Sequence, residues 1–236
     1  MLEVDFHVHS LFSLCGLHTV LELVARAREL GMKGFALTDH GPEIGGRLNS
    51  VFFERFVSPD PEVTVLKGVE CNVLDTQGGI DLPHAYLPFI DMVLCGMHPN
   101  FPKGCAKEIC TESLVAVIEN NPQVDIITHP NDAAYPVDYR RLAGVAARYG
   151  VALEINNSKV HYKRSTPQEV MALLSVCREC GCRIAVNSDT HAIHELGDDR
   201  SVVPLLRETG FPDELVVNRD ATAAFAFVEE RRGLKR

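Results

Sequence analysis

The sequence has no long apolar run. Its longest stretch without Asp, Glu, Lys or Arg is Phe6–Leu21, which has 16 residues and contains three histidines. A helix that crosses a bilayer needs about 20 apolar residues, so this stretch is too short and too polar. Glu3 and Asp5 stand where a signal peptide carries positive charge. We therefore expect a cytoplasmic protein with no membrane partner.

A basic run is also missing. The chain has 23 Lys and Arg residues against 32 Asp and Glu residues, and its net charge is −9. Non-specific binding to nucleic acid depends on neutralising phosphates with Lys and Arg, so we do not expect a nucleic-acid partner. An acidic chain that binds a phosphate ester needs cations from elsewhere, and metal ions are the obvious source.

Repeats, low-complexity tracts and flexible linkers are absent too, which favours a single domain over residues 1–236. The chain has eight cysteines. Without a leader, these are expected to be free thiols. Cys177-x-x-Cys180 resembles half of a zinc site, but no second half follows, so we interpret it as part of a buried helix face.

Short apolar runs recur along the chain and have the character of strands that are buried on both faces of a parallel sheet. There are seven, namely Val4–Val8, Gly34–Leu37, Val63–Val69, Met92–Gly96, Val124–Thr128, Val151–Ile155 and Arg183–Asn187. Amphipathic helices follow most of them. Capping boxes at Thr19-x-x-Glu22 and Thr166-x-x-Glu169 begin two helices. Further helices are expected at about residues 111–120, 138–149, 199–209 and 219–230.

The alternation of strands and helices predicts an α/β fold with a parallel sheet. No Gly-rich phosphate loop follows the first strand, which argues against a dinucleotide-binding fold. A closed or nearly closed, TIM-barrel-like barrel of seven strands fits better than an open sheet. Two connections are longer: residues 41–62 suggest a loop with a short helix, and residues 71–90 suggest a hairpin around Gly78-Gly79.

Metal-binding side chains stand at the ends of the predicted strands. In α/β barrels the carboxyl ends of the strands form the mouth where active sites lie. One histidine at a strand end is a weak signal, but the recurrence of such residues indicates a metal site. Imidazole with carboxylate suits zinc, iron or manganese better than magnesium or calcium. A catalytic zinc takes about three protein ligands, so eight donors imply two or three divalent ions. The donors are His7, His9, His40, Glu70, His98, His129, Asp189 and His191.

The ordered motifs resemble those of the PHP (polymerase and histidinol phosphatase) family, with the closest likeness to its stand-alone phosphatases. They are His7-x-His9, Thr38-Asp39-His40, Glu70, Cys95-Gly96-Met97-His98, Thr128-His129-Pro130 and Ser188-Asp189-Thr190-His191. The resemblance covers about residues 4–218. It implies a distorted seven-stranded (βα) barrel with a trinuclear metal site at the carboxyl ends of the strands. Zinc is the expected metal, with manganese or iron in some members. All eight donors match metal ligands of the family.

A ninth ligand is a histidine in related sequences, and this chain departs from that pattern. Cys15 occupies the corresponding position, and His18 follows three residues later. Three alternatives stay open. The Cys15 thiolate binds a metal, His18 binds it instead, or neither residue does. We include Cys15 in the predicted ligand set, because His18 directly precedes the Thr19 helix cap.

The resemblance implies a metal-dependent phosphoesterase that hydrolyses a small phosphomonoester by attack of a metal-bridging hydroxide. Glu70, Asp189 and His191 are the predicted catalytic residues. Arg164 and Asn156 are candidates for substrate binding. For Arg164 the alternative is a solvated loop, and for Asn156 the alternatives are to hold a metal ligand or to satisfy the strand end. Asp39 either orients His40 or caps the strand end.

Other functions are compatible with the same motifs. Histidinol-phosphate phosphatase is one alternative, and a metal-dependent 3′–5′ exonuclease or polymerase accessory domain is another. The alternative that is not an enzyme is a metal-binding scaffold without activity. Such a scaffold would be expected to have lost several ligands, whereas here only the position of Cys15 departs from the pattern.

Overall fold

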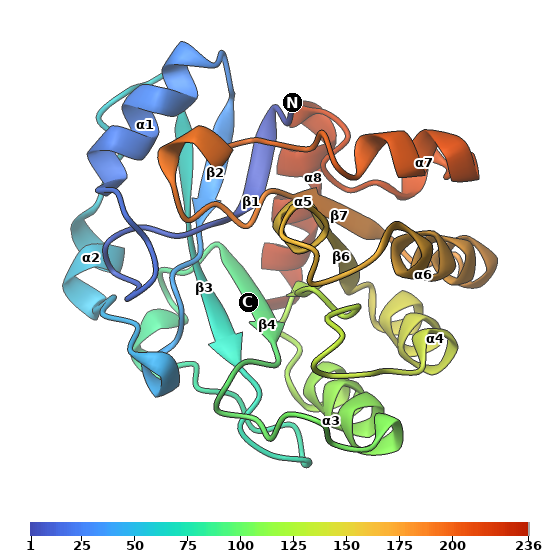
Figure 1. Ribbon diagram of the computed structural model, residues 1–236. Helices are drawn as coiled ribbons and strands as arrows, with labels where there is room; N and C mark the ends of the chain where they lie inside the picture. Colours follow the sequence, from blue (N-terminus) through green and yellow to red (C-terminus); the bar gives the residue numbers. More distant parts are fainter. Residues whose placement is uncertain (236) are drawn as a thin grey trace.

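Seven parallel strands form the centre of the fold in the computed structural model, which describes residues 1–235. Each strand pairs with the next along the chain, so the order in the sheet is the order in the sequence (Figure 1). The strands are β1 (Val4–Val8), β2 (Gly34–Leu37), β3 (Thr64–Asn72), β4 (Met92–Gly96), β5 (Ile126–Ile127), β6 (Ala152–Asn156) and β7 (Ile184–Asn187).

The sheet curls so that its last strand returns to its first. A parallel bridge joins Val8 to Thr190, just beyond the end of β7. Two backbone hydrogen bonds support it, from His9 N to Thr190 O at 2.9 Å and from Thr190 N to His7 O at 3.2 Å. The prediction of a distorted, nearly closed seven-stranded barrel is confirmed.

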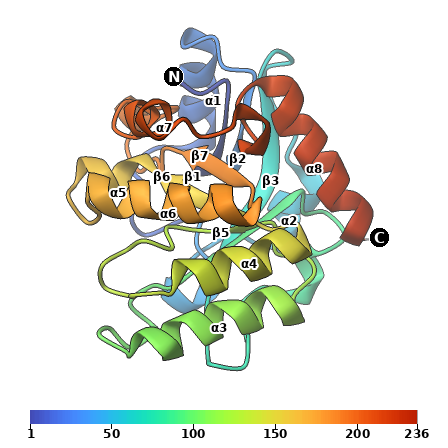
Figure 2. The ribbon, with the colours of Figure 1, turned by 90° about the vertical axis from the view of Figure 1, so that its right-hand side faces the viewer.

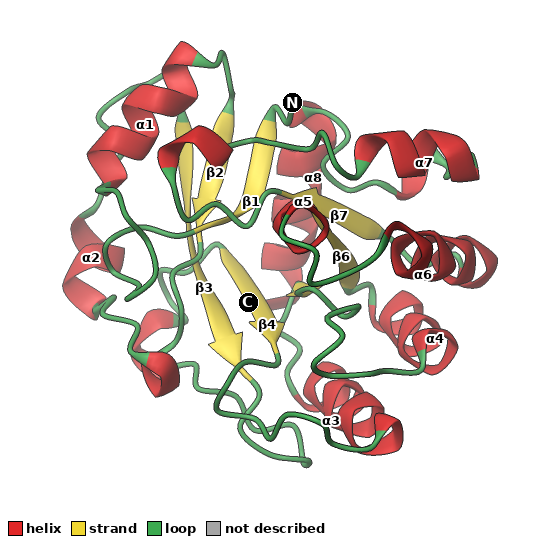
Figure 3. Cartoon of the chain, in the orientation of Figure 1, coloured by secondary structure: helices red, strands yellow, loops and turns green. Residues whose placement is uncertain are grey.

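Helices surround the strands (Figures 1 and 3). One helix, α8, runs across the end of the barrel opposite to the short helix α5 (Figure 2). No described helix is long and apolar enough to cross a membrane. The helices are α1 (Val20–Glu29), α2 (Ser50–Arg55), α3 (Lys107–Asn120), α4 (Tyr139–Tyr149), α5 (Asn157–His161), α6 (Pro167–Cys180), α7 (Val203–Thr209) and α8 (Ala221–Lys235).

The buried apolar residues form two clusters. The larger one lies between the strands and the surrounding helices and includes Cys177. In the smaller one, every strand contributes at least one side chain, and Phe227 and Val228 of α8 pack against them. This smaller cluster is therefore the barrel interior, and α8 closes its amino-terminal end. With that end filled by apolar side chains, polar groups inside the barrel gather at the carboxyl ends of the strands.

An irregularity in β1 helps to place the histidines. Val4 and Phe6 belong to the interior cluster, whereas Val8 belongs to the outer one. The register between β1 and β2 shifts between Asp5 and Val8. A bulge of this kind breaks the alternation of a strand, so that two successive side chains face the same side. His7 therefore joins Phe6 inside the barrel, at the level of the mouth.

Several predicted elements differ in extent; α3, for example, begins at Lys107, four residues before its predicted start. β5 spans only Ile126–Ile127 instead of Val124–Thr128, although Asp125 N and Thr128 N still donate to β4 carbonyls. α7 begins at Val203, because Pro204 lacks an N–H and fits only the first helical turn. The expected hairpin in residues 71–90 reduces to one bridge between Val73 and Ile80.

Candidate metal centre

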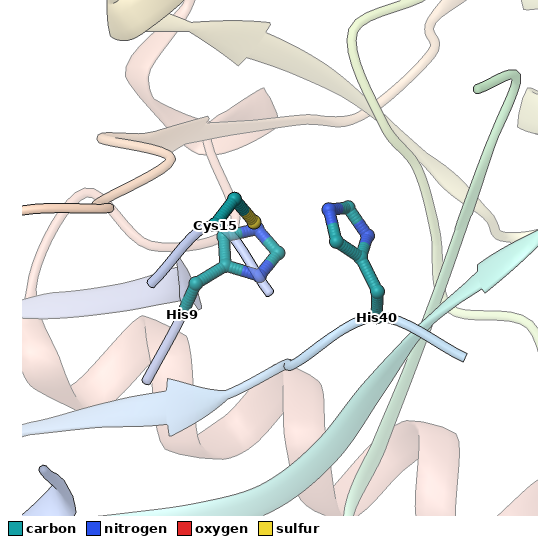
Figure 4. A group of neighbouring side chains, drawn as sticks. All are labelled: His9, Cys15 and His40. Carbon is teal, nitrogen blue, oxygen red and sulfur yellow. The ribbon is translucent and has the colours of Figure 1, made fainter. Parts of the chain in front are cut away.

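The predicted ligands converge at the mouth of the barrel. Among the described residues, three groups of donors could each hold one ion, with all donor atoms of a group within 4.8 Å of one another. One group shares His9 with the second group and His40 with the third, so the three form one continuous cluster. In Figure 4, Cys15 lies beside the His9 ring and His40 faces both. The groups are His9, Cys15 and His40; His7, His9 and Asp189; and His40, Glu70 and His98.

Two further predicted ligands adjoin these groups. His129 Nε2 lies 3.2 Å from Glu70 Oε1. The ring of His191 packs on that of His9, with 4.5 Å between the centroids. The structure thus brings all nine predicted ligands to one place, from loops and strands that are far apart in the sequence.

Glu70 of β3 occupies the middle of the cluster. Its Oε1 accepts a hydrogen bond of 2.8 Å from Thr128 Oγ1. Its Oε2 lies 2.9 Å from His40 Nδ1, 3.2 Å from His7 Nε2 and 3.5 Å from His9 Nε2. Despite these short distances, Glu70 Oε2 and His40 Nδ1 are both buried and have no hydrogen-bond partner. Because an unpaired buried polar atom costs about 1–3 kcal/mol, convergent atoms of this kind fit a bound cation.

Glu154 of β6 contacts two of the predicted ligands, His7 and His129. It is fully buried, and its Oε1 lies 2.7 Å from His7 Nδ1, which leaves His7 Nε2 directed at the cluster. Its Oε2 accepts a hydrogen bond of 2.8 Å from His129 N. Ser13 contacts His9 in the way that Glu154 contacts His7: the Ser13 Oγ lies 3.2 Å from His9 Nδ1 and leaves His9 Nε2 directed at the cluster. Such carboxylate and hydroxyl partners fix which ring nitrogen faces a metal.

Two of the predicted ligands are held in an unusual backbone conformation. Asp189 has φ of 57° and His129 has φ of 34°. Left-handed conformations are uncommon outside glycine and occur disproportionately at functional sites. Asn156 supports Asp189, because its Nδ2 donates to Asp189 Oδ2 at 3.1 Å and to Glu154 Oε2 at 2.9 Å.

The acidic donors are held as anions. Burial acts to raise the pKa of Glu70 and of Asp189, but nearby imidazoles, first that of His7, lower each pKa well below its usual range. Burial acts in the opposite direction on His7, yet the carboxylates of Glu70, Glu154 and Asp189 raise its pKa well above the ordinary value. Buried anions therefore need positive charge at this position, and a divalent cation meets the same need.

The loop after β1 brings Cys15 and not His18 into the donor groups. Burial opposes ionisation of Cys15, but hydrogen bonding to His191 and His40 lowers its pKa to about 6. A thiol of this kind is a thiolate near neutral pH, which is the form that binds metals. His18 is half-buried, and its backbone carbonyl accepts a hydrogen bond from Leu11 N. The geometry favours the first of the three alternatives for the ninth position.

The predicted substrate-binding residues differ in their surroundings. Arg164 is exposed in the loop after α5. Asn156 is buried, and its amide already binds Asp189 and Glu154, so it holds the predicted ligand Asp189 in place. The suggestion that Asp39 orients His40 is wrong, since the Asp39 carboxylate accepts hydrogen bonds from Ser10 N and Ser10 Oγ and so anchors the loop after β1.

Sequence reasoning gave Glu154, Ser13 and Thr128 no role. One signal was available for Glu154, because a carboxylate inside an apolar strand must be paired when the strand is buried. Nothing comparable marks Ser13 or Thr128. Their hydroxyls act through contacts with His9 and Glu70, which the fold brings together.

Comparisons with known proteins give matches over most of the chain. The family model for the PHP domain matches residues 5–158. A "probable phosphatase" of Shewanella sediminis is 36% identical over 97% of this chain and 94% of its own length. A "probable phosphatase" of Caldanaerobacter subterraneus is 34% identical over 98% of this chain and 92% of its own.

Among solved structures, the fold is similar to histidinol phosphate phosphatase from Lactococcus lactis, which was crystallised with zinc, L-histidinol and phosphate. The TM-score is 0.59 at 16% identity, over 89% of this chain and 94% of that chain. At this identity the likeness concerns the fold.

Proposed function

This chain belongs to the PHP domain family, and from that premise we propose that it is a metal-dependent phosphatase that hydrolyses a small phosphomonoester. Curated relatives that match almost the whole chain are named probable phosphatases. The observation that carries the proposal is the pair of buried atoms Glu70 Oε2 and His40 Nδ1, which lie 2.9 Å apart in the middle of the donors and have no hydrogen-bond partner.

The donor set suits two or three divalent ions. Seven imidazole, thiolate and carboxylate donors form the three groups, and His129 and His191 adjoin them. These nine exceed the needs of one ion, which takes about three protein ligands in a catalytic zinc site. Zinc fits best, with manganese or iron as alternatives. When bound, such ions supply Lewis acidity toward phosphate and lower the pKa of water, which provides a nucleophile near neutral pH.

The residues of the chain have separate tasks in this scheme. Glu154 and Ser13 fix the rings of His7 and His9, so that the Nε2 atoms of both rings would be available to hold the ions. Asn156 holds the Asp189 carboxylate in place. In this proposal Glu70, Asp189 and His191 are the catalytic residues, and Arg164 reaches a phosphate oxygen from the rim.

A substrate screen tests the proposed activity. Protein freed of metal and then reloaded with zinc, manganese or iron is incubated with p-nitrophenyl phosphate, sugar phosphates, nucleotides and L-histidinol phosphate. We expect phosphate release from at least one monoester, and loss of that activity with a chelator. Degradation of single-stranded DNA without monoester hydrolysis would favour the exonuclease alternative. No hydrolysis of any substrate with any metal would contradict an enzymatic role.

Replacing Cys15 tests the ninth ligand. Cys15→Ser is expected to weaken binding of one ion by at least about tenfold and to shift the preference from zinc toward manganese, because a soft thiolate favours zinc. The measurement is a titration of metal-free protein with each ion. His18→Ala is the matched control and should change neither property. Unaltered binding of all ions by Cys15→Ser would exclude thiolate ligation.

A further inference from the structure

A buried lysine lies beside the donor cluster, and the scheme above leaves it without a task. Lys159 is in α5, directly after β6, and is only 8% exposed. Its Nζ lies 3.2 Å from Asp132 Oδ2. Lysine is almost never buried unless it is paired, so the position of this ammonium is built into the fold.

Both partners of this ion pair are joined to the cluster through the backbone. Lys159 N donates to Asn156 Oδ1 at 2.9 Å, and the amide of Asn156 binds Asp189. Asp132 N donates to His129 O at 3.0 Å. The ion pair therefore lies at the edge of the cluster, between the segments that carry Asp189 and His129. In agreement, the ammonium of Lys159 contributes to lowering the pKa of Asp189.

The segments around Asp132 and Lys159 are also joined by a contact other than this ion pair. Asn131 Nδ2 donates to Ser165 Oγ at 2.7 Å, and this contact already links the loop after β5 to the loop after α5. Asn131 is buried and its Oδ1 has no hydrogen-bond partner, so this oxygen is available to accept a hydrogen bond from a ligand. Buried ion pairs add little to stability, since desolvation offsets their attraction. A role in binding accounts better for a buried ammonium at this place.

We propose that Lys159 binds the phosphate of the substrate and that Asp132 holds the lysine in position until phosphate arrives. This inference rests on the proposed function. Glu70, Asp189 and Asp132 would repel a phosphate dianion that approaches the mouth. An ammonium, which has three N–H donors, offsets this repulsion and makes a charge-assisted hydrogen bond to a phosphate oxygen. Lys159 would thus act beside the metal ions on the same phosphate.

Two substitutions separate this role from a structural one. Lys159→Met is expected to weaken binding of inorganic phosphate by about ten- to a hundredfold, the range for a lost hydrogen bond to a charged group. Asp132→Asn removes the competing carboxylate but keeps the oxygen that accepts from Ala134 N. Phosphate should therefore bind about two- to fivefold more tightly to Asp132→Asn. A purely structural ion pair predicts similar losses of stability for both variants and no change in phosphate affinity.

The measurement is isothermal titration calorimetry of metal-loaded protein with inorganic phosphate. Lys33→Met is the control, because Lys33 is exposed at the opposite end of the barrel, just before β2. Metal content is determined for each variant, and Lys159→Gln replaces Lys159→Met if the latter does not fold. Wild-type phosphate affinity in the Lys159 variant, or equal weakening in both variants, would overturn the assignment. Failure of the proposed function is seen separately, as wild-type protein that binds phosphate but hydrolyses no ester.

Discussion

An Asp189→Asn variant is expected to lose at least about a thousandfold in turnover of the monoester that the wild-type protein hydrolyses best, which corresponds to about 4 kcal/mol of barrier. Asp189 Oδ1 lies 3.4 Å from His9 Nε2 and 3.5 Å from His7 Nε2. An amide in its place has the same shape but no charge, so a ligand is lost. Asparagine also tolerates the left-handed backbone at this position, with φ of 57°, so the fold should persist.

The control for this variant is Asp213→Asn. Asp213 is exposed and lies near the closed end of the barrel. Three residues later, Val216 pairs with Ile184 at the start of β7. That substitution removes the same charge far from the mouth and should leave turnover unchanged. Thermal unfolding of both variants shows whether the fold is intact. Near-normal turnover by a folded Asp189→Asn protein would contradict a role for this carboxylate at the metal centre.

The second large effect concerns the closed end of the barrel. Arg231→Met is expected to reduce the free energy of unfolding by about 3–5 kcal/mol, the cost of removing one partner of a buried ion pair. Arg231 is only 2% exposed, and its Nε donates to Asp125 Oδ1 at 3.0 Å. Its terminal nitrogens donate to the carbonyls of Val124, Tyr149 and Pro122. One side chain thus connects α8 to the end of α4 and to the segment between α3 and β5.

Chemical denaturation measures this effect, with Arg26→Met as the control. Arg26 forms an exposed ion pair with Glu29 within α1, at 2.9 Å. Exposed pairs of this type contribute less than about 1 kcal/mol, so the control should remain close to the wild type. If Arg231→Met costs no more than Arg26→Met, the buried ion pair does not secure α8.

The barrel and the clustering of the candidate ligands could be predicted because both depend on local patterns. The two-sided burial of β1, β2 and β4 appears directly as apolar runs, and the predicted bounds of these strands agree with the structure. Parallel strands place their carboxyl ends at one edge, so residues that end different strands must meet. His98 and His129 could be assigned to one site for this reason, although they follow different strands.

Other features depend on contacts that no local pattern contains. The bulge in β1 that turns His7 inward is set by the pairing with β2. Lys159 has the appearance of an ordinary helix surface residue, and only the approach of Asp132 from another loop shows that it is buried. Arg231 is a basic residue within a charged terminal helix, and its burial depends on the carbonyls that it meets across the barrel end.

The central claim is that this cluster is a phosphatase centre with more than one metal ion. It is tested most directly by titrating metal-free protein with zinc while phosphate release from an active monoester is followed. We predict that activity is absent without metal, requires at least two equivalents, and reaches its plateau at two or three ions per chain. A plateau at one equivalent, or full activity in the metal-free protein, would contradict the account.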